Sequence, residues 1–275
     1  MPVVELKSGP VAYADTGGQG PVIVLCHGLP MDHRAWRKVA PLLGEFRVIM
    51  PTLPIGGHRL PMRADAELGQ LGVARILGDF LDALEVSEVT LVLNDWGGGQ
   101  YLINQGRAER VGRLVLAACE AFDNFPPGPA KILGVAASVP GGLWLVLQGM
   151  RLRPLRRMRG GYGGMSVVGI PDDLLRDWFL PAQESAEIRR DFAKFAAGNP
   201  TRAQQLTLAE GWSEFRRPVL VVWADRDPLM PAEHGPRLAS LYPDARLEVL
   251  ENCSTLVGED QPERFAQILA DFVRA

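Results

Sequence analysis

One acidic side chain lies where the pattern of the chain predicts a tight, exposed turn. Asp95 comes just after an apolar run at residues 89–93, and Gly97–Gly99 follow it. A strand, a tight turn and a helix over residues 100–105 would form a nucleophile elbow, in which small neighbours let the backbone pass closely. We interpret Asp95 as a candidate nucleophile; the alternative is a glycine-rich turn without chemistry.

A carboxylate at this position favours a particular class of substrate. Aspartate has an ordinary pKa of ~3.9 and is ionised at neutral pH, so it needs no neighbouring base before it attacks. Attack on an acyl carbon would give an anhydride, which is a poor intermediate. Attack on an sp³ carbon with a leaving oxygen or halide gives an ordinary ester. Asp95 therefore favours epoxides or carbon–halogen bonds over acyl substrates.

The composition limits the other classes of function. The chain has 275 residues, 47% hydrophobic content and a net charge of −3, which suits one α/β domain with an insertion and indicates neither nucleic acid nor a membrane surface. The three cysteines, Cys26, Cys119 and Cys253, show no disulfide or metal spacing. The start of the chain shows no signal-peptide pattern, so we expect a cytoplasmic protein. We also expect no metal and no cofactor.

Strand-like and helix-like segments alternate along most of the chain. Strands are predicted at residues 3–6, 11–14, 22–26, 46–50, 89–93, 114–118, 219–223 and 245–250, and helices at about 36–43, 68–84, 100–105 and 262–273. This alternation predicts a mostly parallel sheet with helices on both faces. Residues 122–213 break it, with helical stretches cut by Pro and Gly. We predict a helical cap there, inserted into a core of residues 1–121 and 214–275.

Three motifs in order give the chain a resemblance to a known family. They are His27-Gly28-Leu29-Pro30, Asp95-Trp96-Gly97-Gly98 and Trp223-Ala224-Asp225-Arg226-Asp227-Pro228. With their spacing, the chain resembles the α/β-hydrolase superfamily, and within it the epoxide hydrolase and haloalkane dehalogenase branch. The resemblance implies the α/β-hydrolase fold, a mostly parallel eight-stranded sheet with helices on both faces and a helical cap insertion.

The resemblance also implies roles for individual residues. Asp95 would be the nucleophile, and the backbone N–H groups of Leu29 and Trp96 would form the oxyanion hole. Asp227 matches the acid that orients the histidine of the family. Glu120, at the end of the predicted sixth strand, lies close to where one subgroup of dehalogenases keeps its acid, and it is the weaker alternative.

The chain departs from the family at the histidine itself. Thr255 stands where the family has its catalytic histidine, and no histidine follows His234, which we expect on a solvated helix. Loss of a general base typically costs ~10²–10⁴ in rate. His58 follows two glycines on a loop that edges the pocket in this fold. It is a candidate replacement base, and the alternative is a histidine that stabilises the turn.

Other residues bear on the substrate. Tyr162 is the only tyrosine of the predicted cap and a candidate proton donor to an opening epoxide oxygen, while Trp36, after the His-Gly motif, is a candidate pocket residue. Leu29 stands where dehalogenases often carry an asparagine that holds halide, which weakens the dehalogenase interpretation. Trp96 could still offer its indole N–H to a halide.

Five arginines between Arg151 and Arg159 form a basic segment within the cap. A solvated face is the ordinary explanation, and a docking patch for an acidic substrate or carrier is the alternative. We expect a small-molecule substrate as the partner, with no nucleic acid and no membrane, and a homodimer is compatible with the composition.

Three classes of function stay open at this point. The first is a hydrolase that uses Asp95 on an epoxide or related small apolar substrate, with an atypical or missing histidine base. The second is a non-hydrolytic lyase, isomerase or cyclase in which Asp95 transfers protons, its pKa raised by burial. The third is a catalytically silent ligand binder. The resemblance favours the first.

Overall fold

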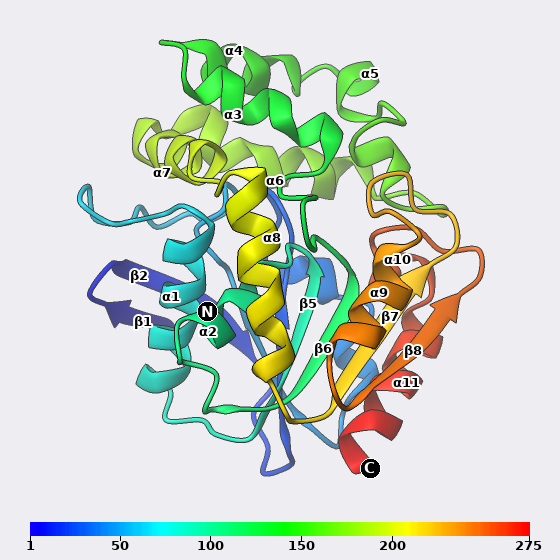
Figure 1. Cartoon of the computed structure of the whole chain (residues 1–275). Coiled ribbons are helices and arrows are strands. Elements are labelled where there is room, and N and C mark those ends of the chain that lie inside the picture. Colours follow the sequence, from blue (N-terminus) through cyan, green and yellow to red (C-terminus); the bar gives the residue numbers. More distant parts are fainter.

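The computed structural model describes residues 1–275, except for the side chain of Pro129, and its core is a single sheet (Figure 1). The strands that the described residues form are ordered β1-β2-β4-β3-β5-β6-β7-β8. Only the β1–β2 and β2–β4 pairs are antiparallel. Their bounds are β1 Val3–Leu6, β2 Gly9–Asp15, β3 Val22–Cys26, β4 Arg47–Pro51, β5 Val89–Asp95, β6 Val111–Cys119, β7 Val219–Ala224 and β8 Ala245–Leu250.

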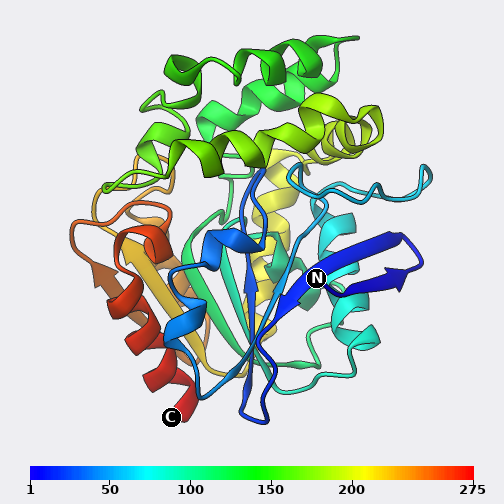
Figure 2. The same cartoon turned by 180° about the vertical axis from the view of Figure 1, so that it is seen from behind.

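Helices cover both faces of this sheet. On one face lie α1 Gln70–Ala83, the short α2 Tyr101–Asn104, α8 Arg202–Glu210 and α9 His234–Leu241 (Figure 1). On the other lies α11 Pro262–Arg274, preceded by α10 Val257–Asp260 (Figure 2). In α11, Phe265, Ile268, Leu269 and Phe272 recur at helical spacing and are buried against the sheet. The predicted mostly parallel sheet with helices on both faces is confirmed.

The cap is a helical layer above the carboxyl ends of the strands (Figures 1 and 2). Its outer helices are α3 Lys131–Ala137, α4 Gly142–Gly149 and α5 Arg153–Arg156, and its inner helices are α6 Asp172–Glu184 and α7 Ala186–Ala197. Apolar side chains from these helices join Met31 and Leu256 of the core in one buried cluster. The cap thus closes over the edge of the sheet where ligands bind in open α/β folds.

Two predicted segments differ from the structure. The expected helix at 36–43 is instead two 3₁₀ turns, His33–Trp36 and Ala40–Leu42, because Pro41 lacks the N–H that a continuous α-helix needs. The last predicted helix of the cap, α8, packs with the sheet: Ala209 and the following Trp212 belong to the main core cluster. A parallel pair such as β6 and β7 needs a covering crossover, and α8 supplies it.

No helix that the described residues form is long and apolar enough to cross a membrane.

Candidate active site

Asp95 lies at the apex of a tight turn at the carboxyl end of β5. Its backbone is left-handed, with φ +61°, a conformation that costs energy for a residue with a Cβ. Gly97 makes the turn feasible, because a Cβ there would lie 1.8 Å from the carbonyl oxygen of Glu120. The strand, the strained residue and the close passage of β6 together hold the Asp95 side chain above the sheet.

The two carboxylate oxygens of Asp95 have different surroundings. The Leu29 backbone N–H donates to Oδ2 at 3.0 Å. This approach requires Gly28, because a Cβ at that position would lie 1.9 Å from the same oxygen. Oδ1 makes no hydrogen bond with any group that the structure describes. One oxygen is therefore held in place while the other remains available for reaction.

Negative charge is poorly compensated around this carboxylate. Burial raises the pKa of Asp95 to about 7, and the negative charge of Asp227 adds to this rise. The hydrogen bond from the Leu29 N–H lowers the pKa, but by less than these two effects raise it. Burial and the charge of Asp95 hold the pKa of Glu120 well above its ordinary value, against hydrogen bonds from Gly97 and Gln70. Within the described residues, Glu120 Oε2 is buried without a hydrogen-bond partner. A site of this kind stabilises neutral or esterified forms of Asp95 over the free anion.

Asp227 and Thr255 form a buried pair beside this site. Asp227 Oδ1 accepts hydrogen bonds from the backbone N–H groups of Leu229 and Met230, at 2.8 and 3.1 Å, and from Thr255 Oγ1 at 2.8 Å. Asp227 Oδ2 is buried and finds no partner among the described groups. Burial raises the pKa of Asp227 despite these three donors. The acid that would orient a histidine thus has one oxygen unused.

The loop that carries Thr255 is tied directly to the elbow. Asn94, the residue before Asp95, donates from Nδ2 to the carbonyl oxygens of Ala117 and Thr255, at 2.7 and 2.6 Å. Thr255 is completely buried. The position of the missing base is therefore fixed relative to the nucleophile by a side chain that the sequence motif did not single out.

Comparison with known proteins shows the family of the chain. A model of the alpha/beta hydrolase family matches residues 23–268. The chain belongs to this family. It is 27% identical over 274 residues to a 2-hydroxy-6-oxononadienedioate/2-hydroxy-6-oxononatrienedioate hydrolase of Paraburkholderia xenovorans, covering 95% of this chain and 89% of that one. It is 25% identical to a 2-hydroxy-6-oxo-6-phenylhexa-2,4-dienoate hydrolase of Burkholderia cepacia, over 95% of this chain and 90% of that one.

Solved structures show the same fold. A putative ancestral haloalkane dehalogenase superposes with a TM-score of 0.78 at 21% identity, covering 100% of this chain and 98% of that one. A meta-cleavage product hydrolase of Pseudomonas fluorescens superposes with a TM-score of 0.73 at 21% identity, covering 96% and 94% of the two chains. At this identity the likeness concerns the fold alone.

In this alpha/beta hydrolase, the backbone N–H and the indole N–H of Trp96 both donate to other groups of the protein. Its backbone N–H donates to the Asn94 carbonyl at 2.7 Å, across the tight turn at Asp95, whereas the oxyanion-hole role would require it to point at a reacting oxygen. Its indole N–H donates to Gln70 Oε1 at 2.6 Å and is buried. The indole is therefore already engaged within the protein and is not free for a halide.

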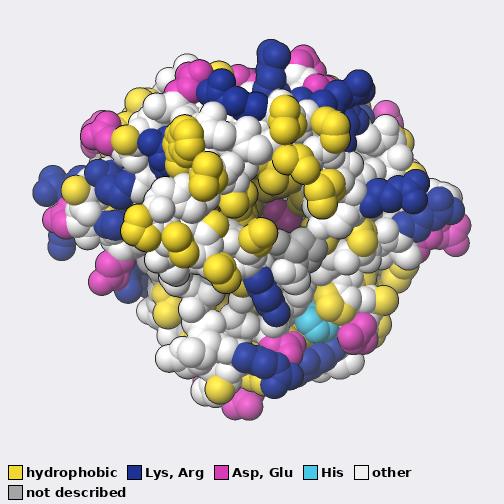
Figure 3. Space-filling view, turned by 90° about the horizontal axis from the view of Figure 1, so that it is seen from above, with side chains coloured by type: hydrophobic (Ala, Val, Ile, Leu, Met, Phe, Trp, Pro, Cys, Tyr) yellow, Lys and Arg dark blue, Asp and Glu magenta, His cyan; other side chains and the backbone are white. Residues whose placement is uncertain are grey.

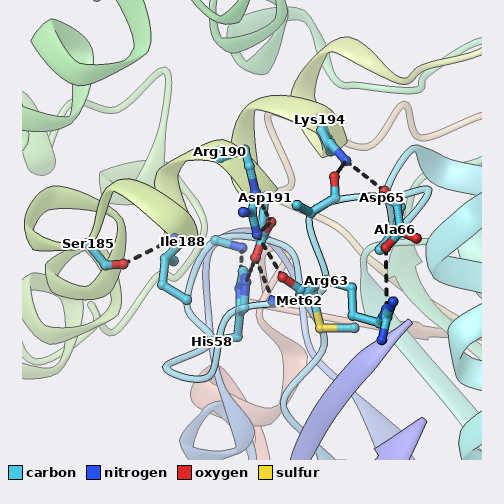
Figure 4. Close-up of polar contacts among 12 residues, drawn as sticks. His58, Met62, Arg63, Asp65, Ala66, Ser185, Ile188, Arg190, Asp191 and Lys194 are labelled. Carbon is cyan, nitrogen blue, oxygen red and sulfur yellow. Dashed lines mark hydrogen bonds and ion pairs between the residues drawn. The ribbon is translucent and has the colours of Figure 1, made fainter. Parts of the chain in front are cut away.

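His58 lies in a separate polar cluster that joins the loop after β4 to α7 (Figure 4). Its Nε2–H donates to Asp191 Oδ2 at 3.3 Å, and its Nδ1 accepts weakly from the Gly56 N–H at 3.4 Å. Asp191 also accepts from the Met62 N–H at 2.8 Å and forms an ion pair with Arg190 at 2.7 Å. Both ring nitrogens of His58 thus bond within this cluster, and neither bonds to Asp95.

Tyr162 and Trp36 have different positions relative to the elbow. The Tyr162 hydroxyl donates to the Leu29 carbonyl at 2.8 Å, and the N–H of the same residue donates to Asp95. Burial raises the Tyr162 pKa well above its ordinary value, and the charge of Asp95 adds to this effect. Trp36 stacks on Phe265 of α11, with ring centroids 6.0 Å apart, within the core on the α11 side of the sheet.

Two other histidines, His27 and His234, are also buried. His27 bridges the loop, with Nδ1–H donating to the Gly28 carbonyl at 2.8 Å and Nε2 accepting from the Leu53 N–H at 2.9 Å. Burial lowers the pKa of His27 to about 4, so it is neutral and structural at physiological pH. The expectation of a solvated His234 is wrong: only 5% of it is exposed, and it packs edge-on against Phe122.

The described residues contain no group of three His, Cys, Asp or Glu side chains placed to hold a metal ion.

Proposed function

We propose that the protein hydrolyses an epoxide on a small apolar substrate, with Asp95 as the nucleophile. The observation that carries this proposal is the Asp95 carboxylate, with Oδ2 held by the Leu29 N–H and Oδ1 unbonded to any described group. The family match over residues 23–268 identifies the chain as an alpha/beta hydrolase, and the proposal concerns its substrate and nucleophile. The buried, uncompensated charge makes ester formation favourable, because the ester is neutral.

The first step would open the ring. Oδ1 of Asp95 attacks one epoxide carbon, a C–O bond of the ring breaks, and the departing oxygen takes a proton. Tyr162 would give this proton, because its hydroxyl lies on the Leu29 carbonyl beside the N–H that holds the nucleophile and would turn from that carbonyl to the substrate oxygen. A proton moved from Tyr162 to the substrate oxygen would later return from solvent.

The second step would break the ester with water. Threonine has no basic nitrogen, so Thr255 cannot accept the water proton as the family histidine does. Asp227 has a buried Oδ2 that bonds no described group, and its charge contributes to the raised pKa of Asp95. We propose that a water between Asp227 and Asp95 occupies the space left by the smaller threonine side chain. Asp227 would take its proton while the water oxygen attacks the ester carbonyl. The bond between the carboxyl carbon and the substrate oxygen would then break, and the departing alkoxide would take the proton from Asp227, which leaves a diol and the free Asp95 carboxyl group.

An epoxide fits the site better than a halide does. The indole N–H of Trp96 donates to Gln70, and Leu29 offers only an apolar side chain. A departing halide needs N–H or O–H donors, whereas an opening epoxide oxygen needs a proton, which Tyr162 would donate once its hydroxyl turns from the Leu29 carbonyl to the substrate. This favours ring opening over dehalogenation.

One observation favours a second candidate function. A carboxyl group with a pKa of about 7 can both accept and donate a proton at neutral pH, as an isomerase, lyase or cyclase requires. In that case Asp95 would form no ester, and the missing histidine would need no replacement.

Intact mass spectrometry during incubation with a panel of epoxides tests the proposal. We expect an adduct of the substrate mass on the wild-type chain and none on Asp95→Asn. The rate of adduct formation should rise with pH through about 7, because only the ionised carboxylate attacks. Turnover without an adduct, with a rate that falls as pH rises, would support proton transfer by the protonated acid. The absence of both adduct and turnover across the panel would support a silent binder.

A further inference from the structure

The outer part of the cap has an unusual charge composition. Residues 124–171 contain six Lys and Arg residues and no Asp or Glu, while the whole chain has a net charge of −3. The rest of the chain therefore carries −9. This segment includes α3, α4 and α5, the outer helices of the cap (Figure 1). The average charge of the chain conceals a strongly basic face.

The same face exposes large apolar side chains. On α3 and just after it, Ile132, Val135 and Val139 are 60%, 68% and 55% exposed, at the spacing of one helical face. On α4, Trp144 and Leu145 are 45% and 64% exposed. A helix on the surface of a globular protein normally presents polar residues to solvent. An exposed apolar patch bordered by charged residues is typical of an interaction surface.

Three of the arginines on this face are available to a partner. Arg156 and Arg157 form ion pairs with Asp172 at 2.8 and 3.0 Å. Arg151, Arg153 and Arg159 are exposed, and among the described residues the nearest acid to any of them is Asp172, 3.9 Å from Arg153. Their charge is thus largely uncompensated within the chain.

We propose that this outer cap face, comprising α3, α4 and the Arg151–Arg159 segment, docks on the surface of an anionic lipid bilayer. Apolar side chains beside basic ones are the combination that inserts at the headgroup boundary of such a membrane. A second copy of the chain is a poorer partner, since it would place the exposed Arg151, Arg153 and Arg159 of one copy against the same three arginines of the other. The proposal replaces the expectation, drawn from net charge, that no membrane is involved.

The position of this face gives docking a consequence. Seen from above, hydrophobic side chains gather around a hollow with an acidic side chain at its floor, and basic side chains lie mainly toward the rim (Figure 3). A protein seated on this face would open its hollow to the bilayer. An apolar substrate could then enter without crossing water. Docking itself goes beyond the proposed function and does not depend on it.

Sedimentation with lipid vesicles tests the proposal without any need for turnover. We expect the protein to partition onto vesicles that contain phosphatidylserine and to leave them as salt is raised. Arg151→Gln/Arg153→Gln/Arg159→Gln and Ile132→Gln/Val135→Gln/Leu145→Gln should each lower the partition coefficient by about tenfold or more. The matched controls are Arg63→Gln/Arg75→Gln/Arg264→Gln and Val3→Gln/Leu42→Gln/Val249→Gln, which make the same number and kind of changes at exposed positions of the core. They should bind as the wild type does.

Two results would overturn the proposal. One is wild-type protein that stays in solution with both phosphatidylcholine and phosphatidylserine vesicles, or control variants that lose as much binding as the cap variants. The other is a dimer in size-exclusion chromatography that the cap variants convert to a monomer, which would assign this face to a second copy. Circular dichroism of every variant distinguishes loss of binding from loss of folding.

Discussion

Two buried aspartates of this protein have opposite environments. Asp191 is completely buried, and its oxygens accept from His58, from the Met62 N–H and from the guanidinium of Arg190. Asp95 is nearly as buried, yet it receives one hydrogen bond from Leu29 and faces other carboxyl groups. The pKa of Asp191 is lowered by its donors despite burial, whereas the pKa of Asp95 rises to about 7.

The difference separates a structural use of buried charge from a chemical one. The Asp191 cluster joins the loop after β4 to the cap, and both carboxylate oxygens of Asp191 have a hydrogen-bond or ion-pair partner there. Around Asp95, the described groups leave oxygens of both Glu120 and Asp227 without hydrogen bonds. Unpartnered buried carboxylate oxygens cost free energy, so the site around Asp95 is less stable than the Asp191 cluster, as the proposed reactivity of Asp95 would require.

The largest expected effect is on catalysis. Asp95→Asn should lower turnover of an epoxide by about 10⁴ or more, because an amide oxygen is not a nucleophile. The fold should remain, since the side chains are nearly isosteric and the glycines set the elbow. Steady-state kinetics and circular dichroism check this, with assays short enough to exclude deamidation. Full activity in the variant would remove Asp95 from the mechanism.

A histidine placed at the position of the missing base should act on the second chemical step. Thr255→His, with Asp227 Oδ2 as its partner, should speed ester breakdown by some part of the ~10²–10⁴ that a general base supplies. Formation of the ester should be unaffected, which single-turnover mass spectrometry can separate. His58→Gln is the control and should leave ester breakdown unchanged. A stalled ester in that variant would instead make His58 the base.

Removal of the charge from the satisfied cluster should destabilise the fold. Asp191→Asn leaves Arg190 without its anion and weakens the bond to His58, at a cost of about 3–5 kcal/mol in the free energy of unfolding. Denaturant unfolding measures this. Asp65→Asn, at an exposed position of the neighbouring loop, should have almost no effect. If both variants were equally stable, the Asp191 cluster would not be what fixes the cap.

The same change at Asp95 should have the opposite sign and a somewhat smaller size. Its pKa is about 7 in the folded chain against 3.8 for an ordinary aspartate, so the folded state binds more protons between these values and loses stability as pH rises through them. Asp95→Asn should remove this loss and gain roughly 2–4 kcal/mol at pH 8 relative to pH 4. Unfolding curves of both chains across that range check it. A wild-type stability as flat as that of the variant would contradict the raised pKa.

The sequence predicted those features that depend on local pattern. The elbow could be predicted from an apolar run, an acid and glycines, and the mostly parallel sheet followed from the alternation of strands and helices along the chain and from the family resemblance. Side-chain pairing over long distances could not be predicted. His58 meets Asp191 across 133 positions, and Asn94 reaches the Thr255 carbonyl across 161. Nothing in the residues near His58 indicates its partner.

Burial of a polar group escaped prediction for the same reason. Gln70 begins α1, where a glutamine would normally be solvated, yet it accepts the indole N–H of Trp96 and donates to Asn199 Oδ1 at 3.1 Å. The role of α8 was also missed, because a helix over the cap and a helix over the sheet have the same local pattern. Only the packing of Trp212 with the core distinguishes them.

The cap occupies a single connection of the chain, between β6 and β7, and this has an evolutionary consequence. The acids and donors at the elbow come from other connections or from the strand ends, so mutations in the cap can accumulate without touching them. Substrate choice and membrane preference can thus diverge while the chemistry is inherited unchanged. Tyr162 and Asp191 are among the cap residues that bond the backbone of the core, the first at the residue that holds Asp95. Descendants of this chain should retain these two cap residues longest.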